Sequence, residues 1–206
     1  MVDNGRVTRI PQQKRSIEKK KRILDAAFEV FGRQGYNNSS TLDIARAAGI
    51  SVGTLYSYFK DKKGLFLECF KIYSDNVQER LLQGYDLRPE SSALDVIEKT
   101  IDILIEVNNV CQSFHDEVLS LMYLDEDVRR FYFQQHDAVS NTIVTQLIDR
   151  KIVSPQNGRE KVFLVIAMIE SISREFIYNS ATTLDRTTLI ELCKSTVIAF
   201  GGLDRP

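Results

Sequence analysis

The chain has 206 residues, of which 43% are hydrophobic and 27% charged, and its formal net charge is −1. This length allows one large or two small domains with a substantial core, and the overall charge alone would argue against a polyanionic partner. Residues 1–62, however, contain 12 Lys and Arg against 6 Asp and Glu, whereas residues 63–206 contain 15 against 22. A positive N-terminal part on a negative remainder is typical of a protein that meets phosphate at one end, although such residues can also merely solvate a tail.

Cysteine usage and hydropathy indicate where the protein works. Cys69, Cys111 and Cys193 are far apart and lie in apolar stretches, which predicts buried, reduced thiols and a cytoplasmic protein. Cys111 and His115 could share a helix face, but no second cluster accompanies them, so we expect no metal and no cofactor. No apolar run reaches membrane-spanning length and the polar N-terminus is not a secretory signal, so we expect no membrane contact.

The first two predicted elements are an arm and a helix. Residues 1–15 are expected to form a flexible basic arm, which could reach the minor groove of a nucleic acid duplex. A helix is predicted over 16–34, and glycines follow its last apolar residues. Apolar residues recur in it at helical spacing. They are Ile23, Leu24, Ala27, Phe28, Val30 and Phe31.

The segment 41–62, TLDIARAAGISVGTLYSYFKDK, predicts two short helices joined by a fixed turn. Ser40 and Asp43 form an S-x-x-D capping pair that begins the first helix. Gly49 ends that helix, because glycine adopts the left-handed conformation without a steric penalty. The expected apolar face of this helix comprises Leu42, Ile44, Ala45 and Ala48.

The second short helix is predicted to lie against a partner. Ser51 caps it, and Leu55 and Phe59 turn its apolar side inward at i, i+4. The outward side carries small residues, hydroxyls and phenols, which is unusual for a surface that faces only water. This arrangement predicts a helix-turn-helix that binds the major groove of DNA. The outward residues are Gly53, Thr54, Tyr56, Ser57, Tyr58 and Lys60.

The remaining chain is also predicted to be helical. Asp61 is expected to cap a long helix over about 61–83, and we place the DNA-binding domain at 16–62 and a second domain at 63–206. Ser92 and Asp95 are expected to cap the next helix. The whole chain is therefore predicted to be all-α with about nine helices. The later ones are expected near 111–123, 126–151, 159–179 and 185–200.

One predicted helix is apolar on all sides. Residues 162–169, VFLVIAMI, leave no polar face for water, so one side needs a cover beyond its own domain. A second copy of the chain would supply it, through a two-fold interface of the helices near 159–179 and 185–200. Ala167 and Ile198 are the positions at which we expect charged substitutions to break this homodimer. The alternative is a monomer in which the helix is wholly internal.

Three segments together resemble the tetracycline-repressor (TetR) family of bacterial transcription regulators. ILDAAFEVFGRQGY, TLDIARAAGISVGTLYSYF and KDKKGLF occur in family order and spacing between about Lys20 and Phe70. The resemblance implies a three-helix DNA-binding domain joined to a helical ligand-binding and dimerisation domain. It also implies three partners: double-stranded DNA, a small-molecule effector and a second copy of the chain.

The resemblance assigns DNA contacts by matching position. Phenols, hydroxyls and an ammonium group suit phosphate oxygens. Ser57 departs from the family pattern, which often has a third aromatic residue there, and this leaves room for a base contact. The expected phosphate contacts are Thr41, Ser51, Tyr56, Tyr58 and Lys62. The expected base contacts are Val52, Gly53, Thr54 and Ser57, with DNA shape contributing much of the specificity because two of them offer no side-chain hydrogen bond.

An effector pocket is expected among the fourth to eighth helices, with a lipophilic or amphipathic ligand. For each apolar candidate the alternative is simple core packing, and Glu170 and Arg174, which are i, i+4 neighbours, could pair only with each other. The candidates are Phe70, Asn108, Gln112, Phe114, His115, Met122, Tyr123, Phe163, Glu170 and Arg174.

These observations favour a homodimeric repressor that binds a palindromic operator and is released by an effector. The alternative is a DNA-binding regulator or architectural protein that has no effector and uses its C-terminal domain for a protein partner. We do not expect an enzyme, because the sequence has no nucleophile–base grouping, glycine-rich phosphate loop or paired carboxylates in an evident site.

Overall fold

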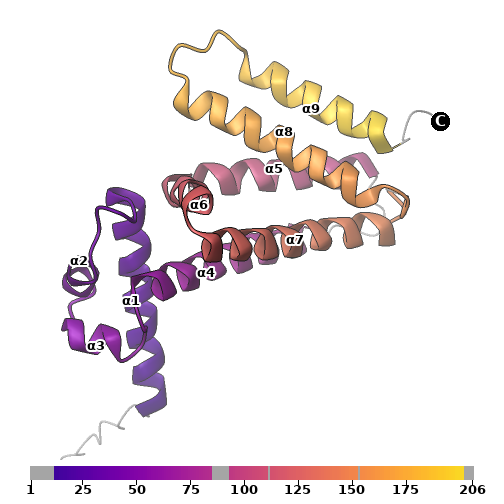
Figure 1. The fold of residues 1–206 in the computed structure, drawn as a ribbon. Helices are drawn as coiled ribbons and strands as arrows, with labels where there is room; N and C mark the ends of the chain where they lie inside the picture. Colours follow the sequence, from indigo (N-terminus) through magenta and orange to yellow (C-terminus); the bar gives the residue numbers. More distant parts are fainter. Residues whose placement is uncertain (1–11, 85–92, 111, 153, 202–206) are drawn as a thin grey trace, which may run out of the picture. The chain divides into compact units, whose positions relative to one another are not determined.

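A computed structural model of the chain describes residues 12–84, 93–110, 112–152 and 154–201. Within these residues the chain forms nine α-helices and no strand, which confirms the all-α prediction (Figure 1). The chain divides into an N-terminal unit, Met1–Phe70, and a C-terminal unit, Lys71–Pro206. The division falls inside the long helix α4 (Lys62–Gly84), whereas the sequence led us to place the domain boundary at the start of that helix.

The N-terminal unit contains α1 (Gln12–Gln34), α2 (Thr41–Ala47), α3 (Val52–Tyr56) and the beginning of α4. Because α1 begins at Gln12, residues 12–15 of the expected arm are helical. The rest of that arm, including Arg6 and Arg9, lies outside the described residues.

Aromatic packing joins α1 to α4 within this unit. Phe31 and Phe66 are fully buried, and their ring centroids are 5.2 Å apart in an edge-to-face arrangement. Tyr36, in the loop after α1, also meets Phe66 edge-to-face at 5.2 Å. Such pairs stabilise a core beyond the area that they bury. They give α2 and α3 a firm support.

The turn between α2 and α3 has the predicted chemistry. Ser40 and Asp43 form a complete capping box at the start of α2. Gly49 has φ +63°, and the N–H groups of Gly49 and Ile50 donate to the carbonyls of Arg46 and Ala45 at 3.1 and 3.0 Å. This is the hydrogen-bond pattern of a Schellman motif, which requires a left-handed residue at Gly49.

Two details of this region differ from the sequence prediction. Leu42 is 53% exposed and does not belong to the apolar face of α2, because it lies two positions from Ile44 and so points away from it. Helix α3 ends at Tyr56, so Tyr58 and Lys60 follow the helix instead of extending it. Ser57 ends α3 because its Oγ donates to the Thr54 carbonyl at 2.6 Å, a local bond that competes with continued helix.

The C-terminal unit begins within α4 and contains five further helices (Figure 1). Helix α8 packs against α5, α7 and α9, while α6 packs against α5 and α7. No helix among the described residues is long and apolar enough to span a bilayer. The helices are α5 (Ala93–Val110), α6 (Gln112–Leu124), α7 (Glu126–Asp149), α8 (Gly158–Tyr178) and α9 (Arg186–Gly201).

Helix α8 is apolar on both its buried and its exposed side. Val162, Ile166 and Ile169 are buried in the C-terminal unit. Phe163 and Leu164 are 58% and 47% exposed in a single chain. In a single chain this exposed side is not covered. A second chain is the cover that we expect from the sequence.

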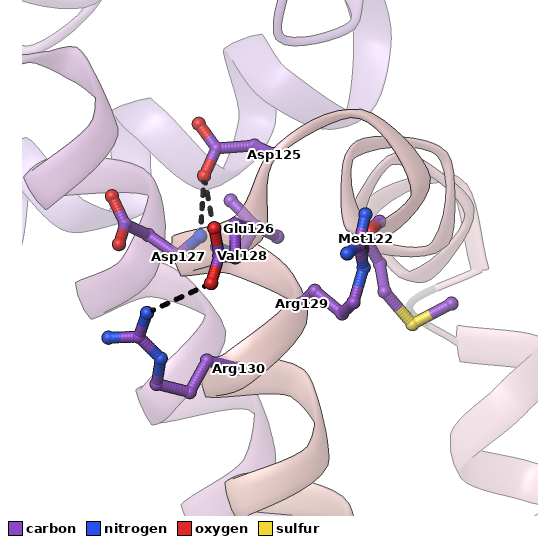
Figure 2. A network of polar contacts seen from close by, with 7 residues as sticks. All are labelled: Met122, Asp125, Glu126, Asp127, Val128, Arg129 and Arg130. Atoms are coloured by element: carbon purple, nitrogen blue, oxygen red, sulfur yellow. Dashed lines mark hydrogen bonds and ion pairs between the residues drawn. The ribbon is translucent and has the colours of Figure 1, made fainter.

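The corner between α6 and α7 is fixed by side chains that cap both helices (Figure 2). The Asp125 carboxylate accepts hydrogen bonds from the N–H groups of Asp127 and Val128 at 2.9 and 3.2 Å, which caps the start of α7. Arg129 donates from Nε to the Met122 carbonyl at 3.1 Å, at the last turn of α6. The two helices are thus tied together where one ends and the next begins.

Substitution of Gly49 tests the turn. Gly49→Ala should lower the free energy of unfolding by about 1–2 kcal/mol, because a Cβ is strained at this positive φ. Gly53→Ala is the matched control: the nearest atom to its added Cβ is Ser51 Oγ at 4.0 Å, so this variant should be as stable as the wild type or more so. Urea denaturation followed by circular dichroism measures both. Equal stability of the two variants would contradict the assignment.

Candidate nucleic-acid interface and effector site

Tyr56 is the most exposed phenol of the helix-turn-helix. Its side chain is 50% exposed, and its hydroxyl lies 3.1 Å from Thr41 Oγ1, at the first residue of α2. The pair joins α2 to α3 at the surface and presents two hydroxyls side by side. Each hydroxyl can donate one hydrogen bond, so the two hydroxyls together can bind two oxygens of one phosphate group.

Tyr58 is held from the other side, by α1. Its hydroxyl lies 3.2 Å from Ser16 Oγ. The sequence analysis did not identify Ser16, because the two residues are 42 positions apart and no local pattern connects them. The two predicted phosphate-binding phenols are therefore each positioned by a hydroxyl on a different helix.

The remaining hydroxyls of α3 shape the helix itself. Ser51 Oγ accepts from the Thr54 N–H at 3.1 Å and lies 2.8 Å from Thr54 Oγ1. Because Ser57 already donates to a carbonyl, it can meet a base only as an acceptor unless its hydroxyl rotates. Gly53 is exposed between these groups, and Val52 is half-buried, so neighbouring backbone can approach closely at this point.

Lys62 lies differently from the sequence expectation. Its ammonium donates to the carbonyls of Tyr36 and Ser39 at 2.7 and 2.9 Å and lies 4.1 Å from the centre of the Tyr36 ring. Ser39 directly precedes Ser40, the cap of α2. The geometry therefore favours a role in holding the loop that positions α2, in place of the direct phosphate contact implied by the resemblance.

Replacement of Lys62 distinguishes these two roles. Lys62→Met should lower the free energy of unfolding by about 1–2 kcal/mol, because two charge-assisted hydrogen bonds are lost. Lys60→Met, an exposed neighbour, should leave stability unchanged. If Lys62 holds the loop, the salt dependence of DNA binding should keep its slope in Lys62→Met. A slope smaller by about one per half-site would instead show a direct phosphate contact.

Tyr56→Phe tests the predicted phosphate surface. Loss of the hydroxyl should weaken binding to operator and to random DNA by about the same factor, because phosphate contacts carry no sequence information. The salt slope should not change, since a phenol carries no charge. Fluorescence anisotropy with both duplexes measures this, and Tyr123→Phe, in α6 of the C-terminal unit, is the control. A change in the preferred sequence would contradict the assignment.

The predicted effector residues fall into three groups. Phe70 belongs to the core of the N-terminal unit, while Phe114 and Met122 are buried in the C-terminal unit. Tyr123 and Phe163 are 74% and 58% exposed, so they do not line an enclosed pocket of a single chain. The side chains of Asn108 and Gln112 lie outside the described part of the structure.

The other three predicted effector residues, His115, Glu170 and Arg174, gather in the C-terminal unit with two residues that were not predicted. We call these five residues the polar cluster: His115 of α6, Tyr132 and His136 of α7, and Glu170 and Arg174 of α8. The Tyr132 and His136 rings are 5.9 Å apart, and His136 lies 6.5 Å from the Phe163 ring. Tyr132 and His136 were not predicted from the sequence, although their i, i+4 spacing on one helix indicates that they share a face.

The electrostatics of the polar cluster are unusual. Burial lowers the pKa of His115 to about 4, and the positive charge of Arg174 adds to this shift. Burial also raises the pKa of the Glu170 carboxyl, against the opposing effects of His136 and Arg174. Perturbed titratable groups that gather in one place are candidates for a functional site.

The C-terminal unit also has a small apolar hollow that is partly open to solvent. It lies between α5, α7, α8 and α9, and none of the predicted effector residues lines it. Its lining includes Ile101, Leu104, Ile143, Leu147, Val162 and Ile166.

Comparison with known sequences gives a consistent result. The family profile described as bacterial regulatory proteins, tetR family, matches residues 23–69. The HTH-type transcriptional regulator AcrR of Shigella flexneri is 37% identical over 90 residues, which are 44% of this chain and 40% of that protein. The fatty acid metabolism regulator protein of Bacillus subtilis is 34% identical over 92 residues, 43% and 46% of the two chains. The match thus spans less than half the length of each relative.

Comparison with solved structures extends the similarity to the whole fold. A transcriptional regulator from Saccharomonospora viridis, solved in complex with choline, has a TM-score of 0.72 over 88% of this chain and 96% of its own. Its sequence is only 19% identical, so the likeness concerns the fold alone. The helix-turn-helix and the C-terminal helical unit are therefore both parts of a known architecture.

Proposed function

This chain belongs to the TetR family of bacterial transcriptional regulators, and we propose that it is a homodimeric repressor that an effector releases from a palindromic operator. The observation that carries the proposal is the surface formed by α2 and α3, which presents paired hydroxyls and phenols on a firm support. The family consists of regulators rather than enzymes. A repressor of this kind works in the cytoplasm, where it meets DNA.

The DNA contacts follow from this surface. In this proposal Thr41, Tyr56 and Tyr58 bind phosphate, with Ser51 at the start of α3, and the exposed hydroxyl pair of Thr41 and Tyr56 supports it. Gly53 and Thr54 face the base edges, Val52 offers a methyl contact, and Ser57 supplies an acceptor. Contacts with few side-chain hydrogen bonds give DNA shape a large share of the specificity.

The exposed side of α8 and α9 supports a homodimer. Leu164 and Ala167 are exposed on α8, and Leu192 is 57% exposed on α9. A small residue beside large apolar ones lets two helices approach closely, and a second copy would cover both exposed sides by two-fold symmetry. Two recognition helices then meet successive major grooves about 34–36 Å apart.

Release by an effector requires that the ligand prefers a form in which this spacing is lost. A tenfold preference corresponds to about 1.4 kcal/mol. The polar cluster and the apolar surface around it support an amphipathic effector bound in the C-terminal unit. The name of one relative is compatible with such a molecule, since that relative is a regulator of fatty acid metabolism.

The alternative is a regulator without an effector, whose C-terminal unit binds a protein partner. The uncovered side of α8 alone would serve that role as well. The buried Nδ1 atom of His115, which has no hydrogen-bond partner, favours the effector, because a flat protein interface gives no reason for it.

Charge introduced at the exposed side of α8 tests the dimer. Ala167→Glu should yield monomers by light scattering and should lower operator affinity by at least tenfold, because one chain can hold only one half-site. Phe133→Glu, at an exposed apolar residue of α7, is the control and should remain dimeric. A dimeric Ala167→Glu variant with full operator affinity would remove α8 from the interface.

A further inference from the structure

Both histidines of the chain lie in the polar cluster, on different helices. His115 is on α6 and His136 on α7, and the α6–α7 corner shown in Figure 2 fixes these helices to each other. Glu170 and Arg174 lie one helical turn apart on α8, near enough for Arg174 to lower the pKa of His115 and for His136 to lower that of Glu170. Phe163 shares their side of α8, because positions i, i+7 and i+11 fall on one helix face.

His115 carries a buried polar atom without a partner. Its Nδ1 is out of contact with solvent and makes no hydrogen bond in the described structure. Its ring lies 6.0 Å from the Tyr73 ring, which holds it in place. Buried polar atoms are nearly always paired, and an exception calls for an explanation such as an absent ligand atom. A neutral imidazole can offer either a donor or an acceptor at this position.

Glu170 and Arg174 are near enough for the positive charge of Arg174 to lower the pKa of Glu170, but they form no direct ion pair. Although their spacing would allow one, neither side chain makes an ion pair or a hydrogen bond within the described residues. Arg174 is exposed, and its planar guanidinium matches the geometry of a carboxylate. Burial raises the pKa of Glu170, so its carboxyl takes up a proton more readily than an exposed one. The polar cluster is therefore better suited to bind an anionic ligand than a cationic one.

We propose that the polar cluster binds the carboxylate of an amphipathic organic acid, with Arg174 pairing with the carboxylate and His115 Nδ1 hydrogen-bonded to one of its oxygens. This names the ligand class of the effector and rests on the proposed function. The guanidinium suits a carboxylate in shape and charge. Phe163 lies on the same face of α8, about three turns before Arg174. It is exposed, its ring is 6.5 Å from the His136 ring, and it would contact the apolar body of the ligand farther from the carboxylate.

A cationic ligand fits the same residues less well. It would have to lie beside the guanidinium of Arg174, whose charge is strong enough to affect the pKa values of His115, Tyr132 and Glu170 alike. It would also need Glu170 to remain ionised in a partly buried place. An anionic and a cationic ligand therefore predict opposite effects on affinity when Glu170 or Arg174 is substituted.

The test compares three probes that share one alkyl chain: decanoate, decanol and decyltrimethylammonium. Binding to the full-length, DNA-free protein is measured by isothermal titration calorimetry below the concentrations at which the probes form micelles. Decanoate should bind most tightly. Arg174→Gln should weaken decanoate binding by about tenfold or more, and His115→Phe, which keeps a ring but removes Nδ1, should weaken it several-fold.

The Glu170→Gln variant distinguishes an anionic ligand from a cationic one. Removal of the negative charge should leave decanoate binding unchanged or tighten it, whereas it would abolish binding of a cation. Arg130→Gln and Glu160→Gln are matched controls at exposed positions, and neither should change decanoate affinity. Circular dichroism confirms that each variant is folded.

Several results would overturn the inference. These are tighter binding of decyltrimethylammonium with loss in Glu170→Gln, equal binding of decanol and decanoate, or binding of none of the three probes. A separate measurement follows the release of fluorescent operator DNA on addition of decanoate. Binding that depends on Arg174 but releases no DNA would leave the carboxylate site standing and would contradict the effector part of the proposed function.

Discussion

The left-handed turn at Gly49 is the constraint on which the proposed DNA-binding surface depends. Its φ of +63° lets α2 end abruptly, so that Ser51 can begin α3 two residues later. Leu55 is fully buried and holds α3 from behind. These two features fix the backbone direction of α3. The side of α3 that faces away from the core can therefore consist of residues that contribute little to stability and are available to bind DNA.

The hydroxyl pairs on this surface connect packing to function. Tyr56 is the last residue of α3 and Tyr58 follows the helix, yet their hydroxyls are held by Thr41 of α2 and Ser16 of α1. Lys62 reaches back from α4 to the loop before α2. Three helices thus position two phenols, which lowers the conformational entropy that DNA binding would otherwise have to remove.

Local chemistry was predictable from the sequence, and contacts between distant residues were not. The capping box at Ser40 and the turn at Gly49 depend on neighbouring residues, so the sequence patterns identified both. The prediction that Leu42 is buried was wrong, because Leu42 and Ile44 were assigned to the same face of α2 although they are only two positions apart. The bonds of Lys62 to the Tyr36 loop could not be foreseen, since they depend on where α1 ends relative to α4.

The same division holds in the C-terminal unit. His115, Glu170 and Arg174 were predicted because they are polar residues on apolar helices. Their proximity to His136 could not be predicted, because it depends on how α6, α7 and α8 pack. The central claim remains that α3 enters a major groove in two copies, and selection of bound sequences from random DNA tests it most directly. The account predicts an imperfect palindrome whose half-sites lie about 10 base pairs apart, or a multiple of that, centre to centre. Enrichment of no sequence, or of a single half-site bound by a monomer, would contradict it.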